Sequence, residues 1–353
     1  MTEKELLVNA DKLEKIVFNI FQGAKVPKEE ADIVANALVS ADARGMTSHG
    51  VMRVPSYAEK IRAGGFKAGK KGKIISETAS TLLIDGEDGL GQVITYYAME
   101  KAIEKAKKSG ASIVGVTRSN HFGEAAYFAL QAVKRDMIGI ITSNGSVNTP
   151  AYGGLTMVSG NLPLAVGVPA GKELPILLDI ASCIVSKGKI IYMAKQGKKI
   201  PKEWGFDSKG QPTDDSQKIL DGGWLATIGG YKGWGLILIF DILSGVLTGG
   251  KVGNEINSLI DGDISIPQGL GHFLIVINVG AFIPINKFKQ RMDNRIRTIK
   301  SSKLAPGFKE ILMPGEREFK LEKVRREKGI PLTEEVIYQL KLQAEKSGVE
   351  FIL

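Results

Sequence analysis

Three side chains that could bind and protonate an acid lie close together near the N-terminus. His49 is one of only three histidines in 353 residues, and Arg53 and Tyr57 follow it four and eight positions later. If a helix begins at about Ser48, this spacing places the imidazole, the guanidinium and the phenol on one face. Histidine titrates near neutral pH, and arginine binds a carboxylate through two parallel hydrogen bonds. The segment could therefore hold an acid and exchange a proton with it.

The same segment also permits a purely structural interpretation. Pro55 lies within it, and a proline inside a helix removes a backbone hydrogen bond and bends the axis. His49 would then be a loop histidine that caps the preceding helix. The local pattern alone leaves both interpretations open.

A second histidine, His121, follows Asn120 in the sequence Ser-Asn-His-Phe-Gly. Apolar residues predict a strand over 112–117 before it, and a helical pattern follows at 124–134. Side chains at such a strand-to-helix turn project into the usual ligand crevice, so His121 is a candidate acid or base. The alternative is a helix N-terminal residue satisfied by backbone contacts. His272, the third histidine, begins an apolar strand, and we interpret it as structural.

Several polar or glycine-rich stretches could bind an anion. Residues 143–154 are rich in turn formers, and a long loop inside a compact domain is often functional. Asp179 follows an apolar strand and precedes small residues typical of a helix start, where it would either join free backbone donors or act as an N-cap. Glycines surround Lys232 before a buried helix, but the Walker pattern of a P-loop is absent.

Hydrophobic periodicity predicts the elements that position these residues. Apolar residues at helical spacing predict helices over 11–21 and from Pro27 to about Gly45, so His49 lies at a helix exit. Short apolar runs separated by turn residues predict strands over 73–76 and 81–85, followed by a helix over 93–108. Chemistry-bearing residues thus gather where elements end.

The glycines before that last helix do not complete a dinucleotide-binding fingerprint. Gly89 and Gly91 begin the pattern, but Ile94 occupies the place of the third glycine. The next strand is followed by Arg118 instead of an acidic residue for the ribose hydroxyls. A phosphate-binding role for Arg118 would be needed to rescue a Rossmann interpretation.

Composition limits the classes of protein that the chain can belong to. With 43% hydrophobic and 24% charged residues, it has the composition of a soluble globular protein of two domains or one elaborated domain. The net charge of +9 is spread over many lysines without interleaved aromatics, which weakly supports nucleic-acid binding and equally suits an anionic substrate and a phosphate-bearing cofactor.

Targeting and metal binding are also limited by the sequence. A single cysteine, Cys183, excludes an internal disulfide and a four-cysteine zinc site. Charged residues from Glu3 to Lys15 exclude an apolar signal core, and no apolar run is long enough for a membrane span, so we expect a cytoplasmic protein. Two histidines, a clamp-type arginine and no metal cluster together indicate metal-free acid/base chemistry on an anionic substrate.

Six motifs occur along the chain in a fixed order. They are Arg-Gly-x-x-Ser-His-Gly-Val-x-Arg-x-Pro-x-Tyr at 44–57, Ser-Asn-His-Phe-Gly at 119–123, Asp-Ile-Ala-Ser at 179–182, Ile-Pro-x-x-Trp-x-x-Asp-x-x-Gly-x-Pro-Thr at 200–213, Gly-Tyr-Lys-Gly-Trp-Gly-Leu at 230–236 and Pro-Gly-Glu at 314–316. In order and spacing this series resembles the type 2 malate/L-lactate dehydrogenase family. The resemblance covers nearly the whole chain.

The resemblance implies an NAD(P)-dependent oxidoreductase that interconverts a 2-hydroxy acid and a 2-oxo acid, with malate and oxaloacetate, or lactate and pyruvate, expected first. It implies an α/β (α+β) fold that is not Rossmann, with a mostly antiparallel NAD(P)-binding sheet flanked by helical regions, in a homodimer. We expect residues 1–72 to form a helical region that packs with the C-terminal segment 290–353, and residues 73–289 to form the NAD(P)-binding domain.

The resemblance also implies roles for individual residues. His121 and His49 become the acid/base candidates, with His121 preferred, while Ser48, Arg53 and Tyr57 would hold the substrate, Arg53 by its carboxylate. The cofactor, NAD or NADP, would be bound by Ser143, Asn144, Gly145, Asp179, Ile180, Ala181, Ser182, Tyr231, Lys232, Gly315, Glu316 and Arg317. A protonated imidazole would give its proton to the alkoxide that forms as hydride reaches the keto carbon.

One departure from the family pattern bears on the substrate. Gly160-Asn161-Leu162-Pro163 stands where many members have Gly-Thr-Asn-Pro or Gly-Asn-Asn-Pro, so an apolar side chain replaces an amide. Alternative substrates are a sugar-derived diketo acid, ureidoglycolate, sulfolactate and a cyclic imino acid. The alternative from another class, a basic nucleic-acid-binding module, predicts salt-sensitive retention on DNA and no nicotinamide binding.

Overall fold

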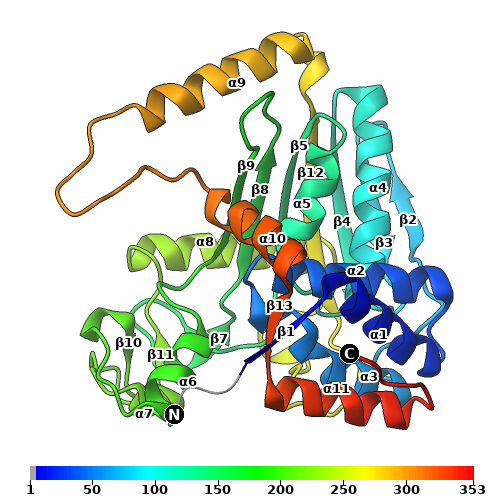
Figure 1. The fold of residues 1–353 in the computed structure, drawn as a ribbon, viewed down its shortest axis with the longest axis vertical. Helices are drawn as coiled ribbons and strands as arrows, with labels where there is room; N and C mark the ends of the chain where they lie inside the picture. The colour runs from blue at the N-terminus through cyan, green and yellow to red at the C-terminus, as the bar shows by residue number, and fades with distance from the viewer. Residues whose placement is uncertain (1–4) are drawn as a thin grey trace.

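A seven-stranded sheet with the strand order β2-β3-β4-β12-β5-β8-β9 forms the centre of the computed structural model, which describes residues 5–353 (Figure 1). Glu3 and Lys4, two of the N-terminal charges noted above, lie outside the described residues. The strands are β2 (Lys73–Glu77), β3 (Thr81–Asp85), β4 (Ala111–Ser119), β5 (Met137–Ser143), β8 (Pro163–Val168), β9 (Ile176–Ala181) and β12 (Leu270–Asn278).

Pairing in this sheet is mostly antiparallel. Within residues 5–353, β3 and β4 form its one parallel pair, and they are joined by helix α4 (Gly91–Ser109). Every other neighbouring pair in the sheet is antiparallel. The expected non-Rossmann, mostly antiparallel sheet is therefore confirmed. The single β-α-β crossover explains why a Rossmann start could be suspected after Asp85, because only a parallel pair needs such a helix.

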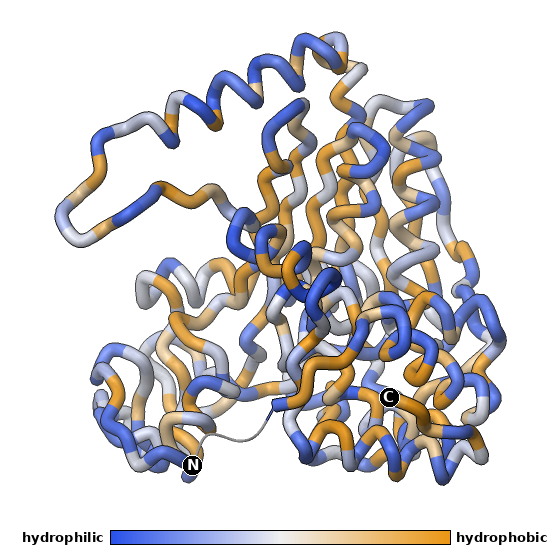
Figure 2. The backbone as a smooth tube through the Cα atoms, in the orientation of Figure 1, coloured by the Kyte–Doolittle hydropathy of each residue, from blue (hydrophilic) through white to orange (hydrophobic). Residues whose placement is uncertain are grey.

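Helices cover the sheet through small and apolar side chains. One face of α4 and most of α5 (Ala125–Val133) share a core with β3, β4, β5 and β12, and many of their buried residues are alanines. Small side chains let a helix approach the strands closely, and Figure 2 shows the hydrophobic strands running beneath these helices. The arrangement fixes both ends of the β4-to-α5 connection, where His121 lies.

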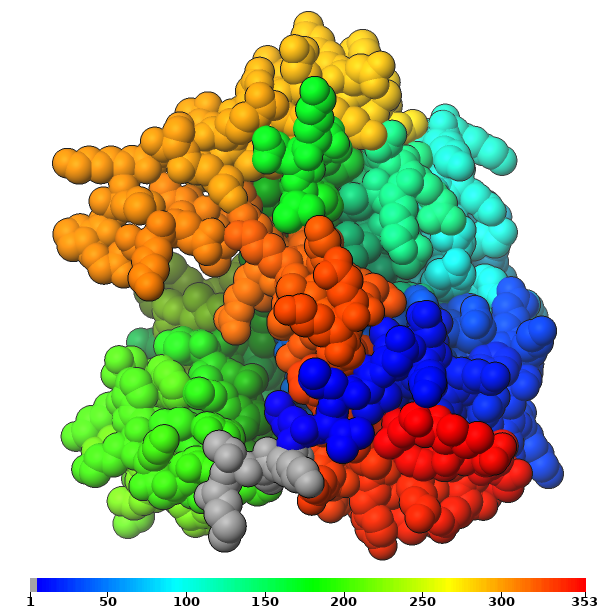
Figure 3. All heavy atoms as spheres, viewed as in Figure 1, coloured from blue at the N-terminus to red at the C-terminus, as the bar shows by residue number. Residues whose placement is uncertain are grey.

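The two ends of the chain pack together in a second core. Helices α1 (Ala10–Gly23), α2 (Lys28–Ala43) and α3 (Val54–Ala63) bury their apolar faces with α11 (Glu334–Lys346), and β1 (Glu5–Val8) pairs with β13 (Ile330–Thr333). Figure 3 shows the blue N-terminal residues against the red C-terminal ones. The proposed division into residues 1–72 with 290–353 and residues 73–289 stays a prediction.

The remaining elements lie around the β8–β9 edge of the sheet. Helix α9 (Ile285–Lys300) crosses the turn between these strands, where Asp293 accepts hydrogen bonds from the backbone of residues 171–173. Also here are β6 (Thr149–Pro150), β7 (Met157–Ser159), α6 (Lys187–Lys195), β10 (Gly205–Phe206), α7 (Ser216–Leu220), β11 (Trp224–Leu225), α8 (Tyr231–Asp241) and α10 (Glu316–Lys328). None of the helices in residues 5–353 is both long and apolar enough to span a membrane.

Candidate active site

His121 lies in the short connection between β4 and α5, as the strand and helix patterns predict. Its neighbour Asn120 is buried and donates from Nδ2 to the carbonyl oxygens of Asp88 and Gly89, both at 2.8 Å. A Cβ atom at Gly91 would lie 2.1 Å from the Asn120 carbonyl oxygen, so only glycine lets α4 begin this close. The turn before α4 therefore holds the His121 segment in place.

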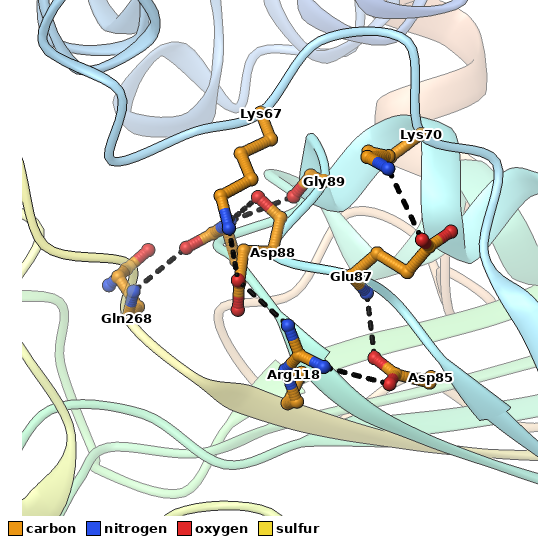
Figure 4. A network of polar contacts seen from close by, with 9 residues as sticks. Lys67, Lys70, Asp85, Glu87, Asp88, Gly89, Arg118 and Gln268 are labelled. Carbon is orange, nitrogen blue, oxygen red and sulfur yellow. Dashed lines mark hydrogen bonds and ion pairs between the residues drawn. The ribbon is translucent and has the colours of Figure 1, made fainter.

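That turn is itself stabilised by charged side chains (Figure 4). Glu87, Asp88 and Arg118 all have positive φ, between 50° and 63°, a region that side chains other than glycine adopt only with strain. Arg118 donates to Asp85 and Asp88, both at 2.9 Å, and Lys67 donates to Asp88 at 2.8 Å. These ion pairs offset the strain. Because the Arg118 guanidinium has two carboxylate partners, the phosphate-binding role considered for it has no support.

A glutamine from a distant loop bonds to both residues of this junction, to the backbone of His121 and to the side chain of Asn120. The Gln268 side-chain oxygen accepts from the His121 backbone N–H at 2.9 Å, and the Gln268 backbone N–H donates to Asn120 Oδ1 at 2.9 Å. Gln268 is fully buried and precedes β12. No local pattern in the sequence points to Gln268, because 147 residues separate the two partners.

The segment around His49 is less regular than predicted. Residues Thr47–His49 and Val51–Arg53 form two separate 3₁₀ turns, and α3 begins only at Val54. The prediction of one continuous helix from about Ser48 is wrong. Pro55 accordingly lies in the first turn of α3, where its missing N–H is not needed.

A buried acid explains the break between the two turns. Asp42 accepts from the Val51 backbone N–H at 2.6 Å, and a Cβ atom at Gly50 would lie 2.2 Å from the Asp42 carboxyl carbon. Burial raises the pKa of Asp42 to about 7, against the hydrogen bond from Val51 and the charge of Arg325. In the sequence, Asp42 lies near the end of a predicted helix, and no local pattern indicates that its carboxylate accepts a hydrogen bond from the backbone of the next turn.

The five residues expected to act on the substrate come together in space. The His49 and His121 rings stack with centroids 5.5 Å apart and planes 15° from parallel. The Tyr57 hydroxyl lies 2.6 Å from His121 Nδ1, Ser48 Oγ lies 2.9 Å from His49 Nδ1, and Arg53 Nε donates to the Ser48 carbonyl at 2.7 Å. Residues from the first helical region and from the sheet thus build one cluster.

Burial and charge keep both imidazoles neutral. Burial, and then the Arg53 charge, lowers the pKa of His49 to about 4. Burial, followed by the charges of His49 and Arg53, holds the pKa of His121 well below its ordinary value. Both residues are nevertheless only partly buried. A bound anion would offset the Arg53 charge and so raise both pKa values.

Arg53 is the cation of this cluster. Its Nε is bonded to a backbone carbonyl, and no carboxylate in residues 5–353 forms an ion pair with its guanidinium. The side chain is only partly buried. Its two terminal nitrogens are therefore available to a carboxylate from outside the protein.

His272 differs from the other two histidines. It is fully buried on β12, with Nδ1 at 2.9 Å from Ser143 Oγ and Nε2 at 2.8 Å from Ser119 Oγ. Burial lowers its pKa to about 3. Both ring nitrogens are used inside the protein, in agreement with the structural role predicted for it.

The first cofactor-binding candidates, residues 143–145, follow β5. Ser143 also donates to the Gly271 carbonyl at 3.1 Å, and Asn144 bonds the backbone of Gly271 and Lys251 through its side chain. Both side chains are buried, so a ligand here would meet the loop backbone and Gly145.

Asp179 lies within β9, and the helix start expected directly after it is wrong, because α6 begins only at Lys187. Its carboxylate accepts from the Ala126 backbone N–H at 2.8 Å, at the N-terminus of α5. Asp179 therefore caps a helix, as one of the two interpretations expected, but the helix is α5 and not one that follows Asp179. Burial raises the pKa of Asp179 to about 6. After Ile180 and Ala181, Ser182 donates to the Leu162 carbonyl at 2.6 Å.

The C-terminal candidates lie against the same strand. The Leu177 backbone N–H donates to the Pro314 carbonyl at 3.0 Å, and a Cβ at Gly315, whose φ is 83°, would lie 2.7 Å from the Leu177 side chain. Glu316 is buried and pairs with Lys300 and Lys320, while Arg317 is exposed. Residues 314–317 therefore lie beside Asp179 and its neighbours.

Tyr231 and Lys232 occupy the first turn of α8, after two glycines with positive φ. Both side chains are exposed, Tyr231 by 63%, and Tyr231 contacts Tyr152 edge-on. A helix N-terminus that carries a lysine suits an anion such as a phosphate. On its inner side α8 packs on Leu162, the residue that departs from the family pattern.

Comparisons with known proteins agree over nearly the full length of the chain. Residues 8–341 match the family model described as malate/L-lactate dehydrogenase. A malate dehydrogenase of Pyrococcus abyssi is 38% identical over 99% of this chain and 97% of its own. A malate/(S)-sulfolactate dehydrogenase of Methanothermus fervidus is 35% identical over 98% and 99%. The solved malate dehydrogenase of Pyrococcus horikoshii superposes with a TM-score of 0.90 at 36% identity, covering 100% of both chains.

Proposed function

The chain belongs to the malate/L-lactate dehydrogenase family, and on that premise we propose that its substrates are malate and oxaloacetate. It is an oxidoreductase that acts on the CH–OH group of a hydroxy acid with a nicotinamide cofactor. Malate is favoured because the relative of 38% identity is a malate dehydrogenase. The observation that carries the proposal is the Arg53 guanidinium, which has no acid partner within residues 5–353 and lies beside two stacked histidines.

In this proposal Arg53 binds the carboxylate next to the reacting carbon, and Ser48 and His49 line the same site. His121 exchanges the proton with the substrate oxygen through Nε2, because Nδ1 is already bonded to Tyr57. A fixed carboxylate orients the substrate carbonyl, so that the proton donor and the hydride both reach it in a single orientation. We assign the donor role to His121 because more contacts hold it in place, on its backbone and on its ring.

The donors around β9 and α8 fit a nicotinamide dinucleotide. Gly315 approaches β9 too closely for any side chain, and the basic first turn of α8 suits a phosphate. Lys232 and Arg317 add exposed positive charge at the predicted positions. When bound, the cofactor supplies the hydride, and the chain's contribution is to hold its phosphates and ribose. Whether NAD or NADP is preferred is settled by assaying both.

The test is an absorbance assay of reduced nicotinamide with a panel of 2-oxo acids, run with NADH and NADPH in parallel. We expect rapid decay with oxaloacetate and slower decay with pyruvate and sulfopyruvate. Cofactor binding measured by fluorescence provides the control. If the cofactor binds but no 2-oxo acid is reduced, the malate proposal is wrong, and the sugar-acid, ureidoglycolate and imino-acid alternatives take its place.

We also propose that the protein works as a homodimer in the cytoplasm. Helix α8, the π-helical turn that follows it (Ile242–Val246) and the next residue expose large apolar side chains. Contiguous apolar patches mark interfaces. The exposed side chains are Leu236, Leu238, Ile239, Ile242, Val246 and Leu247. The cytoplasmic location rests on the single cysteine, which suits a reducing compartment.

Light scattering should therefore give twice the chain mass of 38.0 kDa. Leu238→Glu is expected to raise the dimer dissociation constant at least about tenfold, because it buries a charge at an apolar contact. Tyr338→Glu, at an exposed position on α11, is the matched control and should leave the mass unchanged. A wild-type protein that is monomeric at micromolar concentration would contradict the proposal.

A further inference from the structure

Two hydrogen bonds to the same nitrogen, Nδ1, hold the ring of His121 in place. Nδ1 lies 2.6 Å from the Tyr57 hydroxyl and 3.3 Å from the backbone nitrogen of Gly123. A backbone N–H can only donate, so Nδ1 acts as the acceptor and carries no proton of its own. The neutral ring therefore has its proton on Nε2.

Tyr57 is built to keep this arrangement. Its side chain is 1% exposed, and its ring packs on Phe66 with centroids 5.6 Å apart. Since Nδ1 is an acceptor, the Tyr57 hydroxyl must donate its proton to Nδ1. The buried Gln92 amide lowers the pKa of that hydroxyl. Gln92 Nε2 forms no hydrogen bond in the described chain.

The hydrogen bond from Tyr57 to His121 conflicts with the substrate-binding role expected for Tyr57. A hydroxyl that donates to His121 at 2.6 Å from a buried ring has no second proton to give to a substrate. Arg53 and Ser48 are partly exposed and remain available to bind the substrate.

We propose that Tyr57 is the positioning residue of His121: its hydroxyl keeps the proton of the neutral imidazole on Nε2, facing the substrate, and its own proton follows onto Nδ1 during reduction. This inference rests on the proposed function only for its last step. The orientation of the ring is a property of the ligand-free protein.

The proton transfers balance without an imidazolium ion. As the carbonyl carbon accepts a hydride, the Nε2–H bond breaks and its proton joins the substrate oxygen. The Nδ1 lone pair takes the Tyr57 proton as the phenolic O–H bond breaks, so the ring is neutral before and after. The negative charge moves from the alkoxide to the Tyr57 oxygen, where the Arg53 charge and the Gln92 amide stabilise it. The ring is left with a free Nε2 lone pair, which is the form needed to take a proton in the reverse reaction.

This order of steps suits the acidities of the groups. Burial raises the pKa of Tyr57 to about 12, against the effects of Arg53 and Gln92. An alkoxide is a stronger base than a phenolate, so the combined transfer is favourable. Forming an imidazolium first would be costly, because the pKa of His121 is held well below its ordinary value.

The first test uses the wild-type chain without ligand. In protein labelled with ¹⁵N-histidine, the two ring nitrogens of each neutral histidine have well-separated chemical shifts, and His121→Gln assigns the signals among the three histidines. We expect His121 to carry its proton on Nε2 at neutral pH. A proton on Nδ1 would overturn the proposal. This measurement needs no turnover, so it stays informative even if the protein reduces no 2-oxo acid.

The second test is Tyr57→Phe, which keeps the packing on Phe66 and removes the hydroxyl. We expect kcat for 2-oxo acid reduction to fall about 10- to 100-fold, the loss that is typical when a metal-ligating histidine loses its orienting partner. KM should change less than about threefold, and the His121 signals should move toward a mixture of tautomers. Tyr127→Phe is the matched control, because it removes a tyrosine hydroxyl bonded to Asn36 at 3.0 Å. An unchanged kcat in Tyr57→Phe, or a raised KM alone, would overturn the proposal.

Discussion

Replacing His121 with glutamine is expected to lower kcat for 2-oxo acid reduction by roughly 10² to 10⁴, the usual contribution of a general acid. Glutamine keeps a polar side chain of similar reach but has no proton to release. The backbone bond of residue 121 to Gln268 would remain, so the site should keep its shape. Steady-state kinetics with saturating cofactor measure the loss, and unchanged cofactor affinity shows that the variant is folded.

His49→Gln is the matched comparison, because the two rings stack on each other. We expect a smaller loss, at most about tenfold, since such a ring pair contributes on the order of 1 kcal/mol. If His121→Gln retains near-normal turnover and His49→Gln does not, the donor is His49. The Ser48 hydroxyl at 2.9 Å from His49 Nδ1 would then be its orienting partner.

The location of His121 could be predicted because it depends on local pattern. The strand before it and the helix after it have distinct periodicities, and a residue between them has few other places to lie. The exit of α2 before His49 was predictable for the same reason. What the pattern could not show was the conformation of residues 47–53, because the extended Gly50 is decided by contact with the buried Asp42 carboxylate.

The contacts that give the site its chemistry join residues far apart in the sequence. Tyr57 and His121 are 64 positions apart, and Gln268 lies 147 positions from His121. No periodicity encodes such pairs. Asp179 illustrates the error that follows: its small neighbours predicted a helix start, yet its carboxylate serves a helix 53 residues earlier in the chain.

The order of the strands in the sheet likewise could not be predicted from the residues alone. The β3-α4-β4 crossover has a local signal, a strand, a helix and a strand in succession. The insertion of β12 between β4 and β5 joins segments separated by more than a hundred residues. The mostly antiparallel sheet was expected only because the motifs resemble a family with that fold.

Arg53→Gln is expected to lower kcat/KM for the 2-oxo acid by roughly 10² to 10⁴, mostly through KM. Two charge-assisted hydrogen bonds to the substrate carboxylate would be lost, each contributing about 1.5 to 3 kcal/mol. Arg53→Lys keeps the charge without the planar pair of donors and should recover only part of the loss. Added guanidinium ion should partly restore activity to the glutamine variant.

The histidines offer a second measurement on the same variant. The Arg53 charge lowers the pKa of both His49 and His121, so its removal should raise both values in an NMR titration of the ligand-free protein. If the two pKa values rise but KM stays unchanged, Arg53 lies in the cluster without binding the carboxylate, and another cation must do so. If KM rises as well, one side chain both holds the substrate and lowers the pKa of the two neighbouring rings in the ligand-free protein.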